Sequence, residues 1–188
     1  MKAALYQGQG QIKISTLPDP ICTDDGVILE NIYASICGTD VAVYKHGTGL
    51  GHRITVGGEF GHEVVCSIKE KGKNVTNLSV GDRVYPYPRL VTGDKSRAGT
   101  IGGFSEYIKS PVTRNGVEVY KLSDKISDRT AVLIEPFTVG CRAARRAFPR
   151  QGENAIVFGA GTIGIGAAIA LKHFGCDKVM ICDYSDFR

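Results

Sequence analysis

The 188-residue sequence predicts a protein of the α/β class whose first part is all-β. Up to about residue 125, short apolar runs alternate with Gly, Pro, Asp and Asn, which is typical of a compact β domain of the barrel type. After residue 150, a strand, a glycine turn, a helix and a second strand follow one another, as in a βαβ unit with parallel strands. We therefore expect a first domain over residues 1–150, which ends in a connecting helix, and part of a second domain over residues 151–188.

The expected β domain contains four apolar runs of strand length that end at turn residues. The third run begins with Gly81 and Asp82, which fit a tight turn that leads into a strand at Arg83 to Tyr85. The four runs are residues 27–33, 62–68, 81–85 and 104–108.

From Ser127 the pattern changes to a helical period. Pro136 suits the first turn of a helix, because the N–H group that proline lacks would have no partner there. An apolar stripe at residues 137, 141, 144 and 148 and arginines at 142, 145 and 146 predict a helix after Pro136. Pro149 is expected to end this helix.

The second domain begins with a buried strand at residues 154–158, a helix over about residues 162–174 and a second strand at residues 178–182. Two parallel strands cannot be covered on both faces by this much chain. We therefore expect exposed apolar surface here unless another chain covers it.

The composition, with 43% hydrophobic and 22% charged residues, is that of an ordinary globular protein. The net charge of +4 comes from scattered Lys and Arg, so we expect no nucleic-acid partner. The N-terminus lacks a signal-peptide core and no apolar run has membrane-spanning length, which predicts a cytoplasmic protein without a membrane partner. The six cysteines are dispersed, and we expect thiols, most of them buried in the core.

A glycine fingerprint lies between the second-domain strand and helix. Gly159 permits the tight turn, Gly161 lets a pyrophosphate approach the backbone, and Gly164 allows the helix to pack closely on the strand. The helix N-terminus, at Thr162 and Ile163, offers free N–H groups to a phosphate. A G-x-G-x-x-G motif alone is weak evidence, but the strand before it and the helix after it strengthen the prediction of a dinucleotide site.

Asp183, 19 positions after Gly164, ends the second strand. There it would accept hydrogen bonds from the adenosine ribose and repel a 2′-phosphate, which favours NAD over NADP. Arg188, close by, weakens this preference. The alternative is a turn-forming Asp before Tyr184 and Ser185.

Four residues of metal-binding type lie far apart in the chain: Cys37, His62, Glu63 and Glu135. Zinc accepts thiolate, imidazole and carboxylate together, and a catalytic zinc keeps one position open. Taken singly, Cys37 fits a core thiol, the His-Glu pair fits polar surface, and Glu135 fits a carboxylate at a helix start.

The chain resembles the zinc-dependent medium-chain alcohol dehydrogenase family, and is most similar to its sorbitol and threonine dehydrogenase branches. The resemblance covers almost the whole chain. It rests on the glycine fingerprint and on Cys37-Gly38-Thr39-Asp40, Gly61-His62-Glu63, Gly81-Asp82-Arg83-Val84, Gly102-Gly103-Phe104-Ser105-Glu106-Tyr107 and Ile134-Glu135-Pro136.

The resemblance implies a GroES-like β-barrel catalytic domain, followed by the first βαβ unit of a Rossmann fold. It implies one catalytic zinc held by Cys37 and His62, with Glu63 or Glu135 as a further ligand and Glu63 also counted among the catalytic residues. Zinc would act as a Lewis acid on the substrate hydroxyl, while NAD accepts the hydride. Thr39 is placed to hydrogen-bond the substrate oxygen and relay its proton.

Two departures from the family pattern follow from the sequence. Many relatives have a relay His three residues after the Thr, where this chain has Ala42, so the proton route must differ and could use water or His46. No cysteine lies between Gly81 and Gly103, so we expect no structural zinc. Residues 44, 46, 60 and 89 are loose candidates for the substrate cleft.

Relatives are about twice this long, so the sequence is interpreted as a chain truncated after the first βαβ unit, homo-oligomeric in its full-length form. Two functions remain open. The chain is a zinc- and NAD-dependent dehydrogenase of an alcohol or polyol with a secondary hydroxyl, or a non-catalytic zinc-binding or interaction module of the same family. The isolated chain is expected to be inactive, because the nicotinamide half of the cofactor domain is missing.

Overall fold

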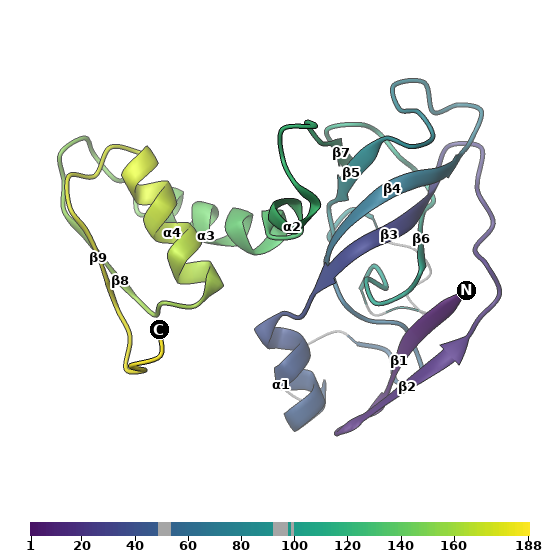
Figure 1. Cartoon of the computed structure of the whole chain (residues 1–188), viewed down its shortest axis with the longest axis horizontal. Helices are drawn as coiled ribbons and strands as arrows, with labels where there is room; N and C mark the ends of the chain where they lie inside the picture. The colour runs from purple at the N-terminus through teal and green to yellow at the C-terminus, as the bar shows by residue number, and fades with distance from the viewer. Residues whose placement is uncertain (49–53, 92–97, 99) are drawn as a thin grey trace. The chain divides into compact units, whose positions relative to one another are not determined.

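The computed structural model describes residues 1–48, 54–91, 98 and 100–188, and is shown in Figure 1. Two compact units divide the chain, Met1–Leu133 and Ile134–Arg188. The sequence analysis placed the boundary at residue 150. The two boundaries differ by the connecting helix, which groups with the second unit because it packs on that unit's other helix.

The first unit is built from two antiparallel sheets. A five-stranded sheet has the order β6-β3-β4-β5-β7, and a hairpin joins β1 to β2. The strands are β1 Lys2–Gly8, β2 Gln11–Thr16, β3 Val27–Ser35, β4 Glu63–Lys71, β5 Arg83–Pro86, β6 Tyr107–Ser110 and β7 Val119–Lys121. Each of the four expected runs contributes a strand, whereas the sequence analysis assigned no element to β1, β2 or β7.

The core of this unit lies on the central strands. Val27 and Leu29 of β3 and Val64 and Cys66 of β4 are fully buried. Each buried aliphatic side chain stabilises the fold by about 1.5–3 kcal/mol. Burial also raises the pKa of the Cys66 thiol, so it stays protonated and packs as a small apolar group. The expectation that most of the six cysteines are buried was wrong, because Cys66 and Cys176 are buried and the other four are partly exposed.

Two short helices lie in the described part of the first unit. The helix α1, Gly38–His46, directly follows the segment after β3, and Val43 is its buried anchor. The helix α2, Asp128–Ala131, begins at Ser127, whose hydroxyl accepts the N–H of Thr130 at 3.2 Å. The change of pattern at Ser127 therefore marks a real helix start.

The second unit contains the expected connecting helix and βαβ unit. Its elements are α3 Ile134–Arg146, β8 Ala155–Phe158, α4 Thr162–His173 and β9 Val179–Cys182, with β8 and β9 parallel. The helices α3 and α4 approach closely at Gly140, where a Cβ atom would lie 2.5 Å from the carbonyl oxygen of Ile163. Only a glycine fits this contact.

The β8–β9 sheet leaves apolar side chains exposed, as expected for two strands without a cover on both faces. The prediction of a buried strand at residues 154–158 was therefore wrong, because alternate residues of β8 are exposed. Phe158 is 84% exposed and Met180 is 59% exposed. Among the described residues, none of the helices has the length and apolar character needed to cross a membrane.

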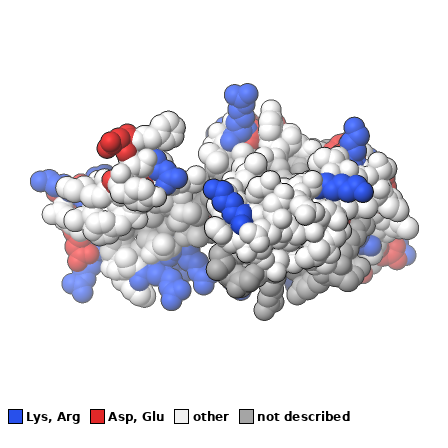
Figure 2. Space-filling view, turned by 90° about the horizontal axis from the view of Figure 1, so that it is seen from below, with Lys and Arg blue, Asp and Glu red and all other residues white. Residues whose placement is uncertain are grey.

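Charged side chains are spread over the surface. In Figure 2 the Lys and Arg side chains lie singly or in small groups, separated by uncharged surface. This face fits the scattered charge of the sequence.

Candidate metal centre

The end of the β3–β4 ladder brings the candidate ligands together. Ser35 and Glu63 form the last pair of this antiparallel ladder. Cys37 lies two residues after the end of β3, and His62 lies one residue before the start of β4. The ligand atoms of Cys37, His62 and Glu63 all lie within 4.8 Å of one another, although Cys37 and His62 are 25 positions apart in the sequence.

Cys37 is fixed by its place at the start of α1. It is the N-cap residue, with extended backbone angles of φ −75° and ψ 152°. Its carbonyl oxygen accepts the N–H groups of Asp40 and Val41 at 3.0 and 3.2 Å. The helix therefore sets the position from which the thiol projects.

His62 is fixed by the turn at Gly61. Gly61 has a φ of +89°, a backbone conformation that residues with a side chain rarely adopt. A Cβ atom there would also lie 2.8 Å from the Phe104 ring, so both the backbone and the ring favour glycine. The Gly61 carbonyl accepts hydrogen bonds from the Gly103 N–H at 2.9 Å and the Thr100 hydroxyl at 2.7 Å. This turn holds the backbone from which His62 and Glu63 project.

Asp40 contacts both Cys37 and His62, two of the three candidate ligands. It is buried, and its Oδ2 accepts the backbone N–H of Cys37 at 2.9 Å. Its Oδ1 lies 3.6 Å from Nδ1 of His62. A carboxylate beside one ring nitrogen favours a proton there, which leaves Nε2 available to a metal.

Glu63 is the buried member of the cluster, with 5% of its surface exposed. Its Oε2 accepts a hydrogen bond from the hydroxyl of Ser35. A buried carboxylate is costly unless it is paired, hydrogen-bonded or bound to a metal. Glu63 has one such partner in Ser35, and a cation in the cluster would supply another.

The donor set fits zinc. Thiolate, imidazole and carboxylate ligands bind zinc at about 2.0–2.3 Å, which puts tetrahedral donor atoms about 3.5 Å apart. The observed separations need only small side-chain movements to reach this value. Because Cys37 and Glu63 would each carry one negative charge, the set also neutralises a divalent ion.

The remaining predicted residues of the metal site lie as follows. Thr39 is exposed in the first turn of α1, and Ala42 is half-buried on the same helix. Glu135 is half-buried in the first turn of α3, in the second unit. Zinc ligation by Glu135 stays a prediction, as does the proton relay by Thr39.

The substitution Asp40→Asn is expected to weaken zinc binding by roughly 10- to 100-fold. The carboxylate of Asp40 orients the His62 ring and makes its imidazole more basic, and the substitution removes that negative charge. Asn keeps an acceptor for the Cys37 N–H, so the fold should persist. Competition with a chromophoric chelator measures the affinity. The matched control is Asp124→Asn, an exposed Asp in the same unit, and an equal loss in both variants would refute the role of Asp40.

The glycine turn of the second unit has the predicted geometry. Gly159 has a φ of +104°, and a Cβ atom on Gly164 would lie 1.8 Å from the Gly159 carbonyl oxygen. Gly161 is the N-cap of α4, whose first residues, Thr162 and Ile163, are exposed. The start of α4 thus presents its N–H groups to solvent, where an anion can reach them.

Asp183 lies against this turn. Its Oδ2 accepts the N–H of Ala160 at 2.7 Å and its Oδ1 accepts the N–H of Ser185 at 2.9 Å, so the predicted turn-forming role is real. These hydrogen bonds, that of Ala160 above all, lower the pKa of Asp183 and keep it ionised at neutral pH. Ribose binding by Asp183 stays a prediction.

Arg188 extends to the same place. Its Nη1 lies 3.7 Å from Oδ2 of Asp183 and 3.8 Å from the position of a Cβ on Gly161. A guanidinium therefore faces the glycine turn together with the carboxylate. From the sequence, Arg188 was expected to weaken the preference for NAD, and the structure places its guanidinium beside Asp183.

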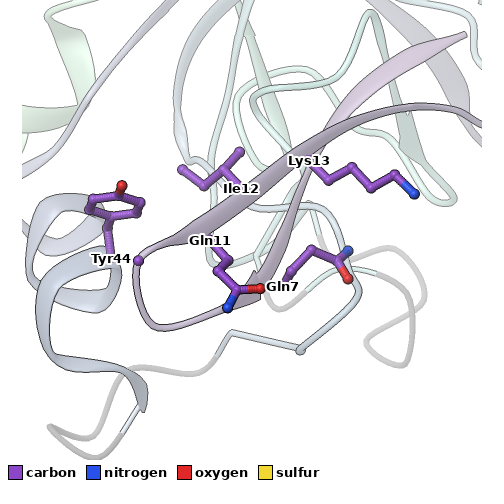
Figure 3. A pocket seen from close by; sticks show the side chains of 6 residues that line it. Gln7, Gln11, Ile12, Lys13 and Tyr44 are labelled. Carbon is purple, nitrogen blue, oxygen red and sulfur yellow. The ribbon is translucent and has the colours of Figure 1, made fainter.

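A separate groove of about 670 Å³ lies between the β1–β2 hairpin and α1 (Figure 3). Gln7, Gln11, Ile12, Lys13 and Tyr44 line it, and none of the three clustered ligands does. Of the loose substrate candidates, Tyr44 thus faces this groove.

The other three candidates divide between core and surface. Phe60 is buried against Tyr6 and Val43, so it belongs to the core. His46 and Arg89 are exposed. None of them belongs to the metal cluster found among the described residues.

Two residues that support the candidate metal site were not predicted from the sequence. Asp40 stands three residues after Cys37, the spacing at which a helix side chain reaches back to the N-cap, so a local signal existed. Ser35 gave no such signal, because its partner Glu63 is defined only by the strand register.

Comparison with known proteins gives consistent matches. Residues 23–124 match the family model of the alcohol dehydrogenase GroES-like domain. The chain is 31% identical to the sorbitol dehydrogenase of Bacillus subtilis, over 100% of this chain and 57% of that protein. It is 32% identical to the L-threonine 3-dehydrogenase of Marinomonas sp., over 99% of this chain and 58% of that protein.

A solved alcohol dehydrogenase of Escherichia coli CFT073 in complex with NADH superposes with a TM-score of 0.83 and 27% identity. The match covers 99% of this chain and 57% of that one. The chain therefore spans little more than half the length of these relatives.

Proposed function

Since the chain belongs to the zinc-dependent medium-chain alcohol dehydrogenase family, we propose that it provides the zinc site and the adenosine side of the cofactor site of a dehydrogenase. The enzyme would transfer a hydride between an alcohol or polyol and NAD. The observation that carries this proposal is the cluster of Cys37, His62 and Glu63, in a chain that also has the glycine turn and Asp183.

The chain's own residues would bind and orient the reactants. Cys37, His62 and Glu63 would hold one zinc per chain, and when bound it supplies a Lewis acid that makes a substrate hydroxyl more acidic. Thr39 Oγ1 would accept the substrate proton and pass its own proton to solvent, to which it is exposed. Because Ala42 has no titratable group, this step would lead directly to water.

The second unit would hold the nucleotide that accepts the hydride. The N–H groups at the start of α4 would bind its pyrophosphate. The ionised Asp183 would accept hydrogen bonds from the ribose hydroxyls and repel a 2′-phosphate, which favours NAD. The reduced nucleotide in the E. coli relative supports this choice.

Secondary alcohols and polyols are the proposed substrates, on the strength of the relatives named for sorbitol and threonine. The homo-oligomeric state and the cytoplasmic location stay predictions.

The substitution Asp183→Asn is expected to reduce the preference for NADH over NADPH, because it removes the negative charge that repels the 2′-phosphate and leaves Arg188 beside it. Asn retains an acceptor for the Ala160 N–H and loses only the acceptor for the Ser185 N–H, so the glycine turn before α4 should persist. Fluorescence titration of the 188-residue chain with each reduced nucleotide measures both affinities. Equal preference in both proteins, or no binding of either nucleotide to the unsubstituted chain, would contradict the proposed cofactor role.

Turnover by this chain would decide in favour of the dehydrogenase. We would follow NADH formation by the zinc-loaded chain with sorbitol, with L-threonine and with simple secondary alcohols. Turnover that depends on zinc supports the dehydrogenase. Zinc binding without turnover is the result expected of this chain alone, and it fits both the non-catalytic metal-binding module and a dehydrogenase that needs the rest of the cofactor domain.

A further inference from the structure

The hydroxyl of Ser35 is hydrogen-bonded to one of the two carboxylate oxygen atoms of the candidate ligand Glu63. Ser35 and Glu63 face each other as the last pair of the β3–β4 ladder, and directly opposed side chains of such a pair project from the same face. The Ser35 hydroxyl donates its hydrogen bond to Oε2. The strand register therefore decides which oxygen of Glu63 is engaged.

This hydrogen bond affects how many zinc positions Glu63 can fill. A carboxylate binds a metal through one oxygen or through both. Binding through both oxygens, together with Cys37 and His62, would fill four positions and leave a tetrahedral ion closed. Binding through one leaves three protein ligands and the open position that a catalytic zinc requires.

Building on the proposed zinc site, we propose that Ser35 is a positioning residue that restricts Glu63 to one-oxygen ligation through Oε1. Ser35 itself touches neither substrate nor metal. Its hydroxyl keeps Oε2 out of the coordination sphere, and thereby keeps the fourth position open for an exchangeable oxygen or nitrogen ligand. Glu63 is buried, so water has little access to Oε2. Among the residues that the structure describes, Ser35 is the hydrogen-bond donor to this oxygen.

The test uses the 188-residue chain loaded with Co²⁺, whose visible spectrum reports the identity and geometry of its ligands, and azide as a probe of the open position. The wild-type protein should show the strong absorption of four-coordinate cobalt and bind azide. In Ser35→Ala, Oε2 is released to the metal and takes the fourth position. The visible spectrum should change because Oε2 replaces the exchangeable ligand, and azide affinity should fall by about tenfold or more.

Two further variants serve as controls. Ser35→Thr keeps a hydroxyl on a strand residue and should restore the wild-type spectrum and azide affinity. Ser67→Ala lies on β4, outside the cluster, and should behave as wild type. A merely structural role for Ser35 would lower the melting temperature of Ser35→Ala without a change in the cobalt spectrum or in azide affinity, and that result overturns the proposal.

Infrared difference spectra keep the proposal testable if Ser35→Ala fails to load cobalt. The separation of the two carboxylate stretches is large for one-oxygen and small for two-oxygen ligation. A small separation for Glu63 in the wild-type protein, assigned through its loss in Glu63→Gln, overturns the Ser35 proposal while the zinc site stands. A wild-type chain that binds neither zinc nor cobalt overturns the proposed function and this inference with it.

Discussion

Replacing Cys37 with Ser is expected to remove zinc binding while the fold is kept. Serine is a favoured N-cap residue, so α1 should form at least as well as in the wild-type protein. The thiolate, however, is lost from a three-residue ligand set. The zinc affinity should fall by more than the roughly 10- to 100-fold that follows loss of a group supporting a ligand. Chelator competition measures the affinity, and circular dichroism checks the fold.

The matched control is Cys22→Ser, a half-buried cysteine of the same unit whose thiol donates to the backbone carbonyl groups of Thr23 and Gly26. It should bind zinc as the wild-type protein does. If Cys22→Ser loses zinc as completely as Cys37→Ser, the thiol of Cys37 has no special part in the site.

Replacing Gly164 with Ala is expected to disrupt both the second unit and its nucleotide binding. The new Cβ would lie 1.8 Å from the carbonyl oxygen of Gly159, so the strand-to-helix turn has to move. Such overpacking costs about 1–3 kcal/mol or more. Thermal unfolding and titration with NADH measure the two effects.

The informative partner of this variant is Gly161→Ala. A Cβ there has as its nearest atom Nη1 of Arg188 at 3.8 Å, and the φ of −73° suits any residue. This variant should fold as the wild-type protein does and lose NADH affinity, because its side chain points to where the pyrophosphate approaches. Normal NADH binding by either variant would show that the nucleotide does not use this turn.

Much of the fold follows from local pattern. The alternation of apolar runs and turn residues predicted the sites of β3 to β6, and the glycine fingerprint predicted the β8–α4–β9 unit. The helix α1 was not predicted, since Val41 and Val43 are β-branched and its apolar residues form no single stripe. Its cap at Cys37 and the burial of Val43 hold it instead.

The metal site was predicted in its residue types and only partly in its arrangement. The residue types singled out Cys37, His62 and Glu63, and the structure brings these three together. The support by Ser35 depends on strand register, and β3–β4 pairing has two irregularities, between Ile28 and Leu29 and between Asn31 and Tyr33. A shift by one residue reverses which face each side chain joins, so register cannot be read from spacing alone.

X-ray absorption at the zinc edge tests the central claim most directly, because it counts the sulfur atoms bound to the metal. For the purified chain with zinc, we expect one sulfur at about 2.3 Å and the remaining ligands as nitrogen or oxygen at about 2.0–2.2 Å. The sulfur contribution should vanish in any zinc retained by Cys37→Ser. A wild-type shell with several sulfur atoms, or with none, would contradict the site built from Cys37, His62 and Glu63.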